Sequence, residues 1–377
     1  MEHYVSKKKF SPKFLEENNA ALPMSFQQIV WWKFKRHRLA VLSAVILCVF
    51  YLVSLFVEIV SPYNPHQKHS QYAYAPPQKI HFFHEGNFVG PFVYGYQASL
   101  NLETLEREYT VNYDQVDSLR FFCSGEKYKF WSLWEGSSHL FCAAEKGTVF
   151  LLGTDQLGRD VLSRIIYATR ISLTVGLIGI TISFLLGIII GGIAGYYGGI
   201  IDHIVQRAIE TLRSLPELPL WMALSAAVPA TWSALWVYFS LTIILAILDW
   251  PGLARAVRSK FLALKEEDFC MAAKFMGASP KRVIFRHLMP NFSSHLIASI
   301  TLSIPSMILA ETALSYLGLG LRDPIISWGV LLNNAQNINV IALYPWLLWP
   351  VFPVILVILC FNFFGDGVRD AIDPQKH

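Results

Sequence analysis

The chain has 377 residues, of which 54% are hydrophobic and 15% are charged, and its formal net charge is +4. This composition excludes an ordinary soluble protein of that size and indicates a membrane protein with several spans. We expect no cleavable signal peptide, because the first apolar run starts near Leu39, behind a basic tail.

Residues 1–38 form a basic tail in which aromatic residues and bases alternate toward the end. The residues concerned are Lys7, Lys8, Lys9 and Lys13, then Trp31, Trp32, Lys33, Phe34, Lys35, Arg36 and Arg38. Such a run suits a helix that lies on the membrane surface and contacts lipid. We do not expect nucleic-acid binding, because a span follows at once. Leu39 to Val57 is uncharged and can cross a bilayer, which takes about 20 residues, so we place the first transmembrane helix within residues 39–60.

Residues 61–165 differ in character from the rest of the chain. They contain prolines, glycines, many aromatic residues and mixed charges, with no apolar run of spanning length. The stretches PFVYGYQ and KYKFWSLW resemble strands. We therefore expect a small β-rich insert between the first two spans. Cys123 and Cys142 both lie in it, so a disulfide is possible if the insert is exported.

Two patterns in this insert resemble chemical sites but lack essential residues. The paired histidines have no nearby cysteine or carboxylate to complete a tetrahedral metal site. These pairs are His66 with His69 and His81 with His84. The run from Gly153 to Gly158 has the glycine spacing of a P-loop, but Arg159 replaces its lysine and Asp160 replaces the hydroxyl that would hold magnesium. We expect no metal site and no nucleotide site in this chain. Any nucleotide that supplies energy for its function must therefore be bound by another chain.

Five further spans are expected in a core that covers residues 166–365. They are Ile171–Tyr196, Pro216–Val228 with a backward extension from Ile204, Ala230–Leu248, Phe292–Ala310 and Tyr344–Phe364. In the second span a small residue recurs every four positions, which allows another helix to pack at close range. These residues are Gly179, Ser183, Gly187, Gly191, Gly195 and Gly199.

The distribution of lysine and arginine sets the expected topology. The N-terminal tail and the segment from Arg255 to Arg286 are rich in these residues, whereas the loop at 314–343 has only Arg322. Positively charged short loops stay in the cytoplasm, so we place the tail and the loop 265–291 there. Six spans put the C-terminal tail, residues 366–377, in the cytoplasm too, and they leave the 61–165 insert outside.

The polar stretch DFCMAAKFMGASPKRVIFRHLMPN separates the fourth and fifth spans. Asp268 can cap a helix start, and Gly277 suits a helix C-terminus that needs a left-handed residue. Ser279 reads as a second cap, followed by a proline at the first helical position, and Pro290 closes the unit. The pattern predicts a short helix, a glycine bend and a second short helix.

The spacing of Ala272, Ala273, Gly277 and Pro290 in this stretch resembles the EAA loop of binding-protein-dependent ABC importer permeases. Met271 stands where that family usually has glutamate. Three other stretches, LGTDQLGRDVLSRIIYATRISL, ETALSYLGLGL and FNFFGDGVRDAIDP, are similar to the C-type subunit of oligopeptide and dipeptide permeases. The match covers most of residues 31–60 and 150–375.

The resemblance implies an all-α polytopic protein of the bacterial inner membrane, with six transmembrane helices and no enzymatic activity of its own. It implies a heterodimer with a homologous B-type permease subunit, two cytoplasmic ATPases that hold ATP and magnesium, and an extracytoplasmic solute-binding protein. It also implies a coupling helix that docks into a groove on the ATPase. The residues implied at that contact are Asp268, Ala272, Ala273, Gly277, Ser279, Arg282, His287 and Pro290. Because the insert is longer than in the common dipeptide-type members, the substrate stays open.

Glu311 lies at the far end of the fifth span. Carboxylates inside a membrane are costly, so Glu311 is a candidate for the transport pathway. Alternatively, it caps a helix TALSYLGLG at a break in the span. Two other classes of protein remain open, namely a channel or proton-coupled carrier and an intramembrane hydrolase that uses Glu311 or the loop histidines. The basic bent loop argues against both, because neither needs a docking element for a motor.

Overall fold

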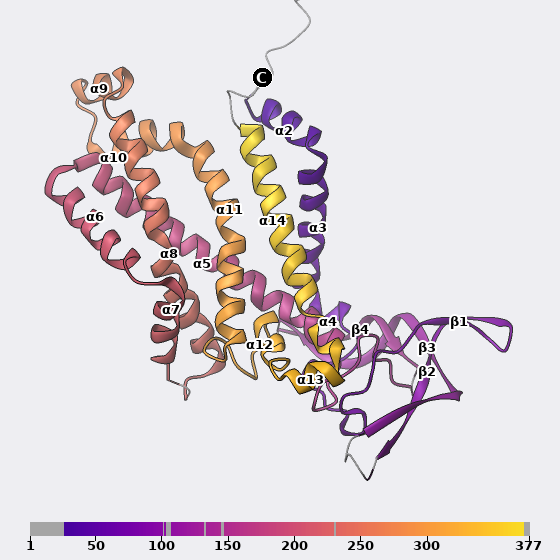
Figure 1. The fold of residues 1–377 in the computed structure, drawn as a ribbon. Coiled ribbons are helices and arrows are strands. Elements are labelled where there is room, and N and C mark those ends of the chain that lie inside the picture. The colour runs from indigo at the N-terminus through magenta and orange to yellow at the C-terminus, as the bar shows by residue number, and fades with distance from the viewer. Residues whose placement is uncertain are drawn as a thin grey trace, which may run out of the picture.

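The computed structural model describes residues 26–100, 102, 107–131, 133–144, 147–229 and 231–372. Lys7, Lys8, Lys9 and Lys13 of the basic tail and residues 373–377 of the C-terminal tail lie outside the described residues. A bundle of long helices carries a β-sheet at one end (Figure 1). The described residues contain five helices that are long and apolar enough to cross a membrane. They are Arg38–Leu55, Val161–Tyr197, Ala234–Leu264, His295–Tyr316 and Pro345–Ile372.

Short helices and turns connect the long elements. In chain order the elements are α2 (Phe26–Arg36), α3 (Arg38–Leu55), α4 (Val57–Val60), η1 (Ser70–Tyr72), β1 (His81–His84), β2 (Asn87–Leu100), β3 (Arg107–Phe130), β4 (Trp134–Ala143), α5 (Val161–Tyr197), α6 (Gly199–Arg213), α7 (Glu217–Ala226), α8 (Ala234–Leu264), α9 (Asp268–Phe275), α10 (Pro280–Val283), η2 (Ile284–Leu288), α11 (Met289–Tyr316), α12 (Trp328–Asn333), α13 (Ile338–Leu343), η3 (Pro345–Leu348) and α14 (Val351–Ile372). We call the end of the bundle with the sheet, α12 and α13 the sheet end, and the opposite end, with α2 and α9, the α9 end (Figure 1).

The long helices extend beyond the predicted spans, into stretches that carry charged residues. α5 begins at Val161, well before the predicted Ile171. Its start is capped by Asp160, whose Oδ2 accepts a hydrogen bond from the Ser163 N–H at 2.8 Å. α8 likewise continues past the predicted end at Leu248 and stops at Leu264.

The predicted third span, Pro216–Val228 with its extension from Ile204, is not one continuous helix. α6 ends at Arg213, and α7 begins only after Pro216, which occupies the N-cap position of α7. Proline has no N–H to continue a helical ladder, so the chain breaks here. Together α6 and α7 lead from the end of α5 at the α9 end to the start of α8 at the sheet end (Figure 1). The chain therefore returns along the bundle through two short helices.

Residues 26–36 of the basic tail form the helix α2, which packs on the bundle. Phe34 lies edge-on against Phe364 of α14, with ring centroids 5.7 Å apart. Trp31 and Trp32 remain largely exposed, and Lys35 lies over the Trp31 ring at 5.0 Å. An exposed aromatic face next to bases fits the interface between lipid and water.

The insert contains a four-stranded antiparallel sheet in the order β1-β2-β3-β4. The stretch PFVYGYQ lies in β2. The stretch KYKFWSLW, predicted as a strand, instead contains the turn between β3 and β4, where Phe130 pairs with Trp134 and Trp131 has a φ of +49°. The Trp131 ring N–H donates to the Leu55 carbonyl at 3.1 Å, which ties this turn to the end of α3. Cys123 on β3 and Cys142 on β4 are joined, with Cα atoms 6.3 Å apart.

The small-residue stripe of α5 packs mainly against α8. A Cβ on Gly191 would lie 2.3 Å from the Ala254 carbonyl oxygen, and one on Gly195 would lie 2.8 Å from that of Arg258. Gly187 faces the Leu253 side chain, whereas Gly179 faces Met307 of α11. Gly199 lies beyond α5, at the start of α6. The stripe thus sets the distance between the two longest helices of the bundle.

The close approach of α5 and α8 predicts that Gly191→Ala destabilises the protein by about 1–3 kcal/mol, because the new methyl group meets backbone that cannot move alone. Gly192→Ala is the matched control on the same helix and should destabilise the protein less. Its methyl group would meet the edge of the Phe261 ring at 3.2 Å, which is a side chain and not backbone. Thermal unfolding of the two purified variants in detergent measures the difference. Equal unfolding midpoints would contradict the prediction.

Candidate functional site

The polar stretch between α8 and α11 forms the predicted helix and glycine bend. Gly277 follows α9 with a φ of +78°, which favours glycine. Its N–H donates to the Lys274 carbonyl at 2.9 Å, and the Ala278 N–H donates to the Ala273 carbonyl at 3.0 Å. This is a Schellman ending. Ser279 then caps α10, because its hydroxyl accepts from the Arg282 N–H at 3.4 Å.

Two details of the predicted stretch are wrong. Glu267, and not Asp268, occupies the N-cap position of α9, and it makes no side-chain capping bond. Asp268 lies in the first turn, where a carboxylate is stabilised by the helix dipole. Pro290 does not close the unit either, because α10, the π-helical turn Ile284–Leu288 and α11 follow one another without a loop. Pro290 falls in the first turn of α11, where a missing N–H is tolerated.

One face of this stretch packs firmly against the bundle. Cys270 of α9 and Val283 of α10 are completely buried, and Ala273 is 3% exposed. Cys270 and Val283 share a hydrophobic cluster with Phe261 of α8 and Phe292 of α11. The α9–α10 unit is therefore packed against both long helices.

The other face is open and apolar at its tip. Phe275 is 89% exposed and Met276 is 82% exposed. Ala272 and Gly277 are also exposed, and nothing lies within 4 Å of a Cβ built on Gly277. Exposed basic residues flank the tip, namely Lys274, Lys281, Arg282 and Arg286. Further along the chain, His287 is half-buried and Pro290 is exposed. We call the exposed residues 271–286 the α9 surface. Contiguous exposed apolar groups with a polar rim mark interaction sites.

Ala273 does not belong to the α9 surface. The family resemblance implies both Ala272 and Ala273 at the partner contact, but Ala272 is exposed whereas Ala273 is buried. Ala273 fills the chain's own core, so close approach on this side rests on Ala272 and Gly277.

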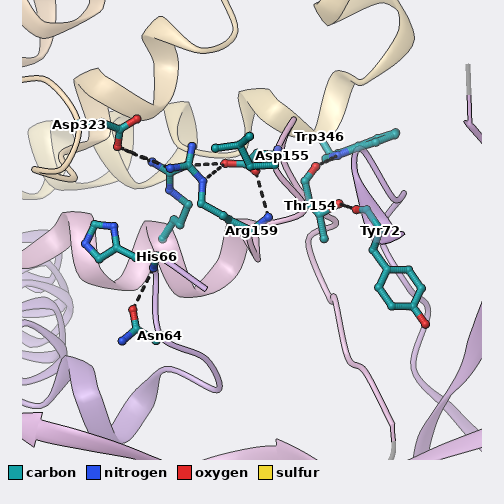
Figure 2. Close-up of polar contacts among 10 residues, drawn as sticks. Asn64, His66, Tyr72, Thr154, Asp155, Arg159, Asp323 and Trp346 are labelled. Carbon is teal, nitrogen blue, oxygen red and sulfur yellow. Dashed lines mark hydrogen bonds and ion pairs between the residues drawn. The ribbon is translucent and has the colours of Figure 1, made fainter. Parts of the chain in front are cut away.

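At the sheet end a buried ionic cluster joins segments far apart in the sequence (Figure 2). The Asp155 carboxylate accepts from Arg159 Nε at 2.7 Å and also from Arg164 Nη1. Arg164 Nη2 in turn donates to Asp323 Oδ1 at 3.2 Å. Asp155, Arg159 and Arg164 are at most 5% exposed. The cluster thereby fixes the loop before α5 to the loop between α11 and α12.

Hydrogen bonds around Thr154 extend this cluster to two more segments. Its hydroxyl accepts from the Ala75 N–H at 2.8 Å and donates to the Tyr72 carbonyl. Its own carbonyl accepts from Trp346 Nε1 at 3.0 Å (Figure 2). The Tyr74 and Tyr344 rings stack beside it, with centroids 4.0 Å apart. Burial raises the pKa of the neighbouring Asp160 to about 6, although hydrogen bonds from Ser163 oppose the shift.

Glu311 lies inside α11 and is 2% exposed, so the prediction that it caps a new helix is wrong. Its carboxylate accepts from the Ser315 hydroxyl at 2.7 Å and from the Ser172 hydroxyl at 3.4 Å. These hydroxyls accept in turn from the backbone N–H groups of Leu321 and Trp328 at 3.0 and 3.1 Å. Glu311 therefore organises the join between α5, α11 and the following loop.

Several charged residues that matter in the structure were missed in the sequence. Arg170 pairs with Glu58 at 2.7 Å, Arg258 pairs with Asp202, and Asp249 accepts from the Ser183 hydroxyl at 3.0 Å. Each of these arginines, and Asp249, lies in a helix that is long and apolar enough to span a membrane. A charge inside or beside an apolar run is the signal that could have found them.

Comparisons with known proteins agree on one class. A family described as the binding-protein-dependent transport system inner membrane component matches residues 187–377, and the N-terminal TM domain of oligopeptide transport permease C matches residues 25–77. The dipeptide transport system permease protein DppC of Bacillus subtilis is 40% identical over 224 residues, which are 59% of this chain and 68% of that protein. The oligopeptide transport system permease protein OppC of Haemophilus influenzae is 39% identical over 224 residues, which are 59% and 70% of the two chains.

A solved structure of the MetNI methionine ABC transporter, in an inward facing conformation, covers 56% of this chain and 96% of that chain at 19% identity. The TM-score of this match is 0.42, so we draw no conclusion about this chain from it.

The ionic cluster predicts that Asp155→Ala destabilises the protein by about 3–5 kcal/mol, because two buried guanidinium groups lose their shared partner. Glu210→Gln is the control, since it breaks an exposed pair with Arg207 and should change the free energy of unfolding by less than about 0.5 kcal/mol. Unfolding of both purified variants in detergent measures this. An Asp155→Ala protein as stable as the control would show that the cluster is not structural.

Proposed function

Since the chain belongs to the binding-protein-dependent transport system inner membrane components, and is a transmembrane permease subunit of an ABC importer, we propose that it moves peptides or similar small solutes inward. Support for the solute class comes from the dipeptide and oligopeptide permeases that are 39–40% identical to it. In this proposal it is the C-type subunit, paired with a homologous B-type permease subunit. A separate solute-binding protein delivers the solute outside.

In the proposed arrangement the α9 end faces the cytoplasm of a bacterial cell and the sheet end faces outside. Both the N-terminal and C-terminal tails then lie in the cytoplasm, and the 61–165 insert lies outside. The break between α6 and α7 belongs to the third of six crossings. Basic residues on the α9 surface support this orientation, because short cytoplasmic loops are rich in lysine and arginine.

The α9 surface carries the proposal, because it is an exposed apolar tip on a rigid base. We place one of two cytoplasmic ATPase subunits on it, with ATP and magnesium bound in those subunits. Phe275 and Met276 would enter a groove of the ATPase, Ala272 and Gly277 would permit close contact, and Arg282 would donate a charge-assisted hydrogen bond.

Movement of the ATPases would reach the spans through covalent and packed connections. α10 leads without a loop into α11, and buried Cys270 ties α9 to α8 and α11. The ionic cluster would hold the outer end together while the α9 end shifts. The spans would thus alternate between outward-open and inward-open states by rigid-body movement.

The rival classes find less support in the contacts. An intramembrane hydrolase would need an activated nucleophile, but Glu311 is held by serine hydroxyls that also bind the backbone of the neighbouring loop. An ATPase-independent channel or carrier gives no reason for an exposed apolar tip on a basic loop.

The docking proposal predicts that Phe275→Glu reduces co-purification of the ATPase subunits by about tenfold or more, because an aromatic anchor in a groove contributes at least 1–2 kcal/mol. ATPase activity stimulated by the binding protein should fall with it. Phe83→Glu is the matched control, because Phe83 is 64% exposed at the sheet end. Full association of the Phe275→Glu variant would refute docking at this tip.

Export of the insert predicts that Cys123 and Cys142 form a disulfide in the cell, because disulfides persist in oxidising compartments. Peptide mapping of alkylated membranes without reductant should recover the two cysteines in one linked peptide. Cys48, Cys270 and Cys360 serve as internal controls and should be alkylated after denaturation. Recovery of Cys123 and Cys142 as free thiols would contradict either the disulfide or the exported location.

A further inference from the structure

A cavity of about 440 Å³ lies among the long helices, between their middle and the α9 end. Its wall combines apolar side chains with an unusual number of charged and hydroxylic ones. The polar members are Ser183, Arg213, Asp249, His295, Ser299, Ser303 and Arg369, contributed by α5, α6, α8, α11 and α14. None of these residues belongs to the ionic cluster or to the α9 surface.

Asp249 is the acidic residue of this wall. It lies midway along α8, and its Oδ2 accepts from the Ser183 hydroxyl at 3.0 Å, while no described side chain donates to its Oδ1. The side chain is exposed within this chain despite its depth in the bundle. Ionised groups inside a membrane are costly, and they mark pathways or binding sites.

Arg213 supplies an opposite charge close by. A Cβ built on Gly252 would lie 2.9 Å from Arg213 Nη2, so the guanidinium rests directly on α8. Gly252 follows Asp249 by three residues, which puts both on one face of the helix about one turn apart. Yet no described acidic side chain comes within ion-pair distance of Arg213. The two charges are neighbours that do not pair with each other.

The backbone beside these charges is also interrupted. Arg213 is the last residue of α6, and the break to α7 follows it, with residues 213–218 all exposed. Non-helical backbone at membrane depth is tolerated only where it is buried in protein or lines a water-filled cavity. Broken helices near the membrane midplane are also where transporters place their ligands.

We propose that Asp249 and Arg213 form a site within the permease that binds a zwitterionic solute in transit, Asp249 taking its ammonium group and Arg213 its carboxylate. The proposal rests on the proposed import of peptides. The open Oδ1 of Asp249 accepts the ammonium protons, and the Arg213 fork fits a carboxylate. The Ser299 and Ser303 hydroxyls line the cavity on the α11 side.

The test uses the complete complex with its binding protein in proteoliposomes and three radiolabelled probes, trialanine, N-acetyl-trialanine and trialanine amide. Relative to wild type, Asp249→Asn is expected to lower uptake of trialanine and the amide by about tenfold and to leave the acetylated probe unchanged. Arg213→Gln is expected to lower uptake of trialanine and the acetylated probe and to spare the amide. Glu210→Gln, a carboxylate of α6 outside the cavity, should change none of them.

Stimulation of ATPase activity by the loaded binding protein should persist in both cavity variants, which shows that each complex is assembled and coupled. The site is overturned if both variants lower all three probes equally, if they change none, or if they lose the partner permease on purification, which would make the two charges a subunit contact. A wild-type complex that imports no peptide overturns the proposed function and the site with it, whereas wild-type import with unselective variants overturns the site alone.

Discussion

The shared ion pair of Asp155 with Arg159 and Arg164 is the interaction on which the sheet end depends. These side chains are buried, where an unpaired charge is far more costly than in water, so the segments that bear them cannot separate without a large loss of free energy. Asp323 brings in the loop after α11. The α9 end has no such cluster among the described residues, and instead it has a cavity lined by charges that do not pair with each other. The ionic cluster thus holds the segments of the sheet end together, whereas the bundle toward the α9 end contains the cavity.

In the proposed coupling, this asymmetry would let a small surface act on long helices. The α9–α10 unit has its own hydrophobic base, shared with Phe261 of α8 and Phe292 of α11, so it cannot swing as a loose loop. α11 continues from it as a helix down to Tyr316, where Glu311 joins α11 to α5 and the following loop. In the proposed function, a displacement of α9 would therefore be transmitted along α8 and α11 as rigid bodies, and the ionic cluster at the sheet end would resist it.

Local structure could be predicted from the sequence, because local rules decide it. Gly277 was expected at a left-handed position and Ser279 at a cap, and both are found there. The position of Glu311 could not be predicted in the same way, since a carboxylate before an apolar run reads as a cap unless its partner Ser172, on another helix, is known. The ionic cluster could not be predicted for the same reason, because Asp155 and Asp323 come together only in the folded chain.

The break between α6 and α7 is a second feature that the sequence analysis did not predict. An apolar count from Ile204 to Val228 predicts a span, and the chain does return along the bundle there. The count takes no account of Pro216, which cannot continue the ladder of α6. In the proposed arrangement of six crossings, the bilayer requires that the interrupted backbone be covered by protein or water. Arg213 at the break and Asp249 beside it are side chains that would hold water or a polar solute at that depth. The break between α6 and α7, which made the prediction of one continuous helix wrong, therefore also places Arg213 in the polar wall of the cavity.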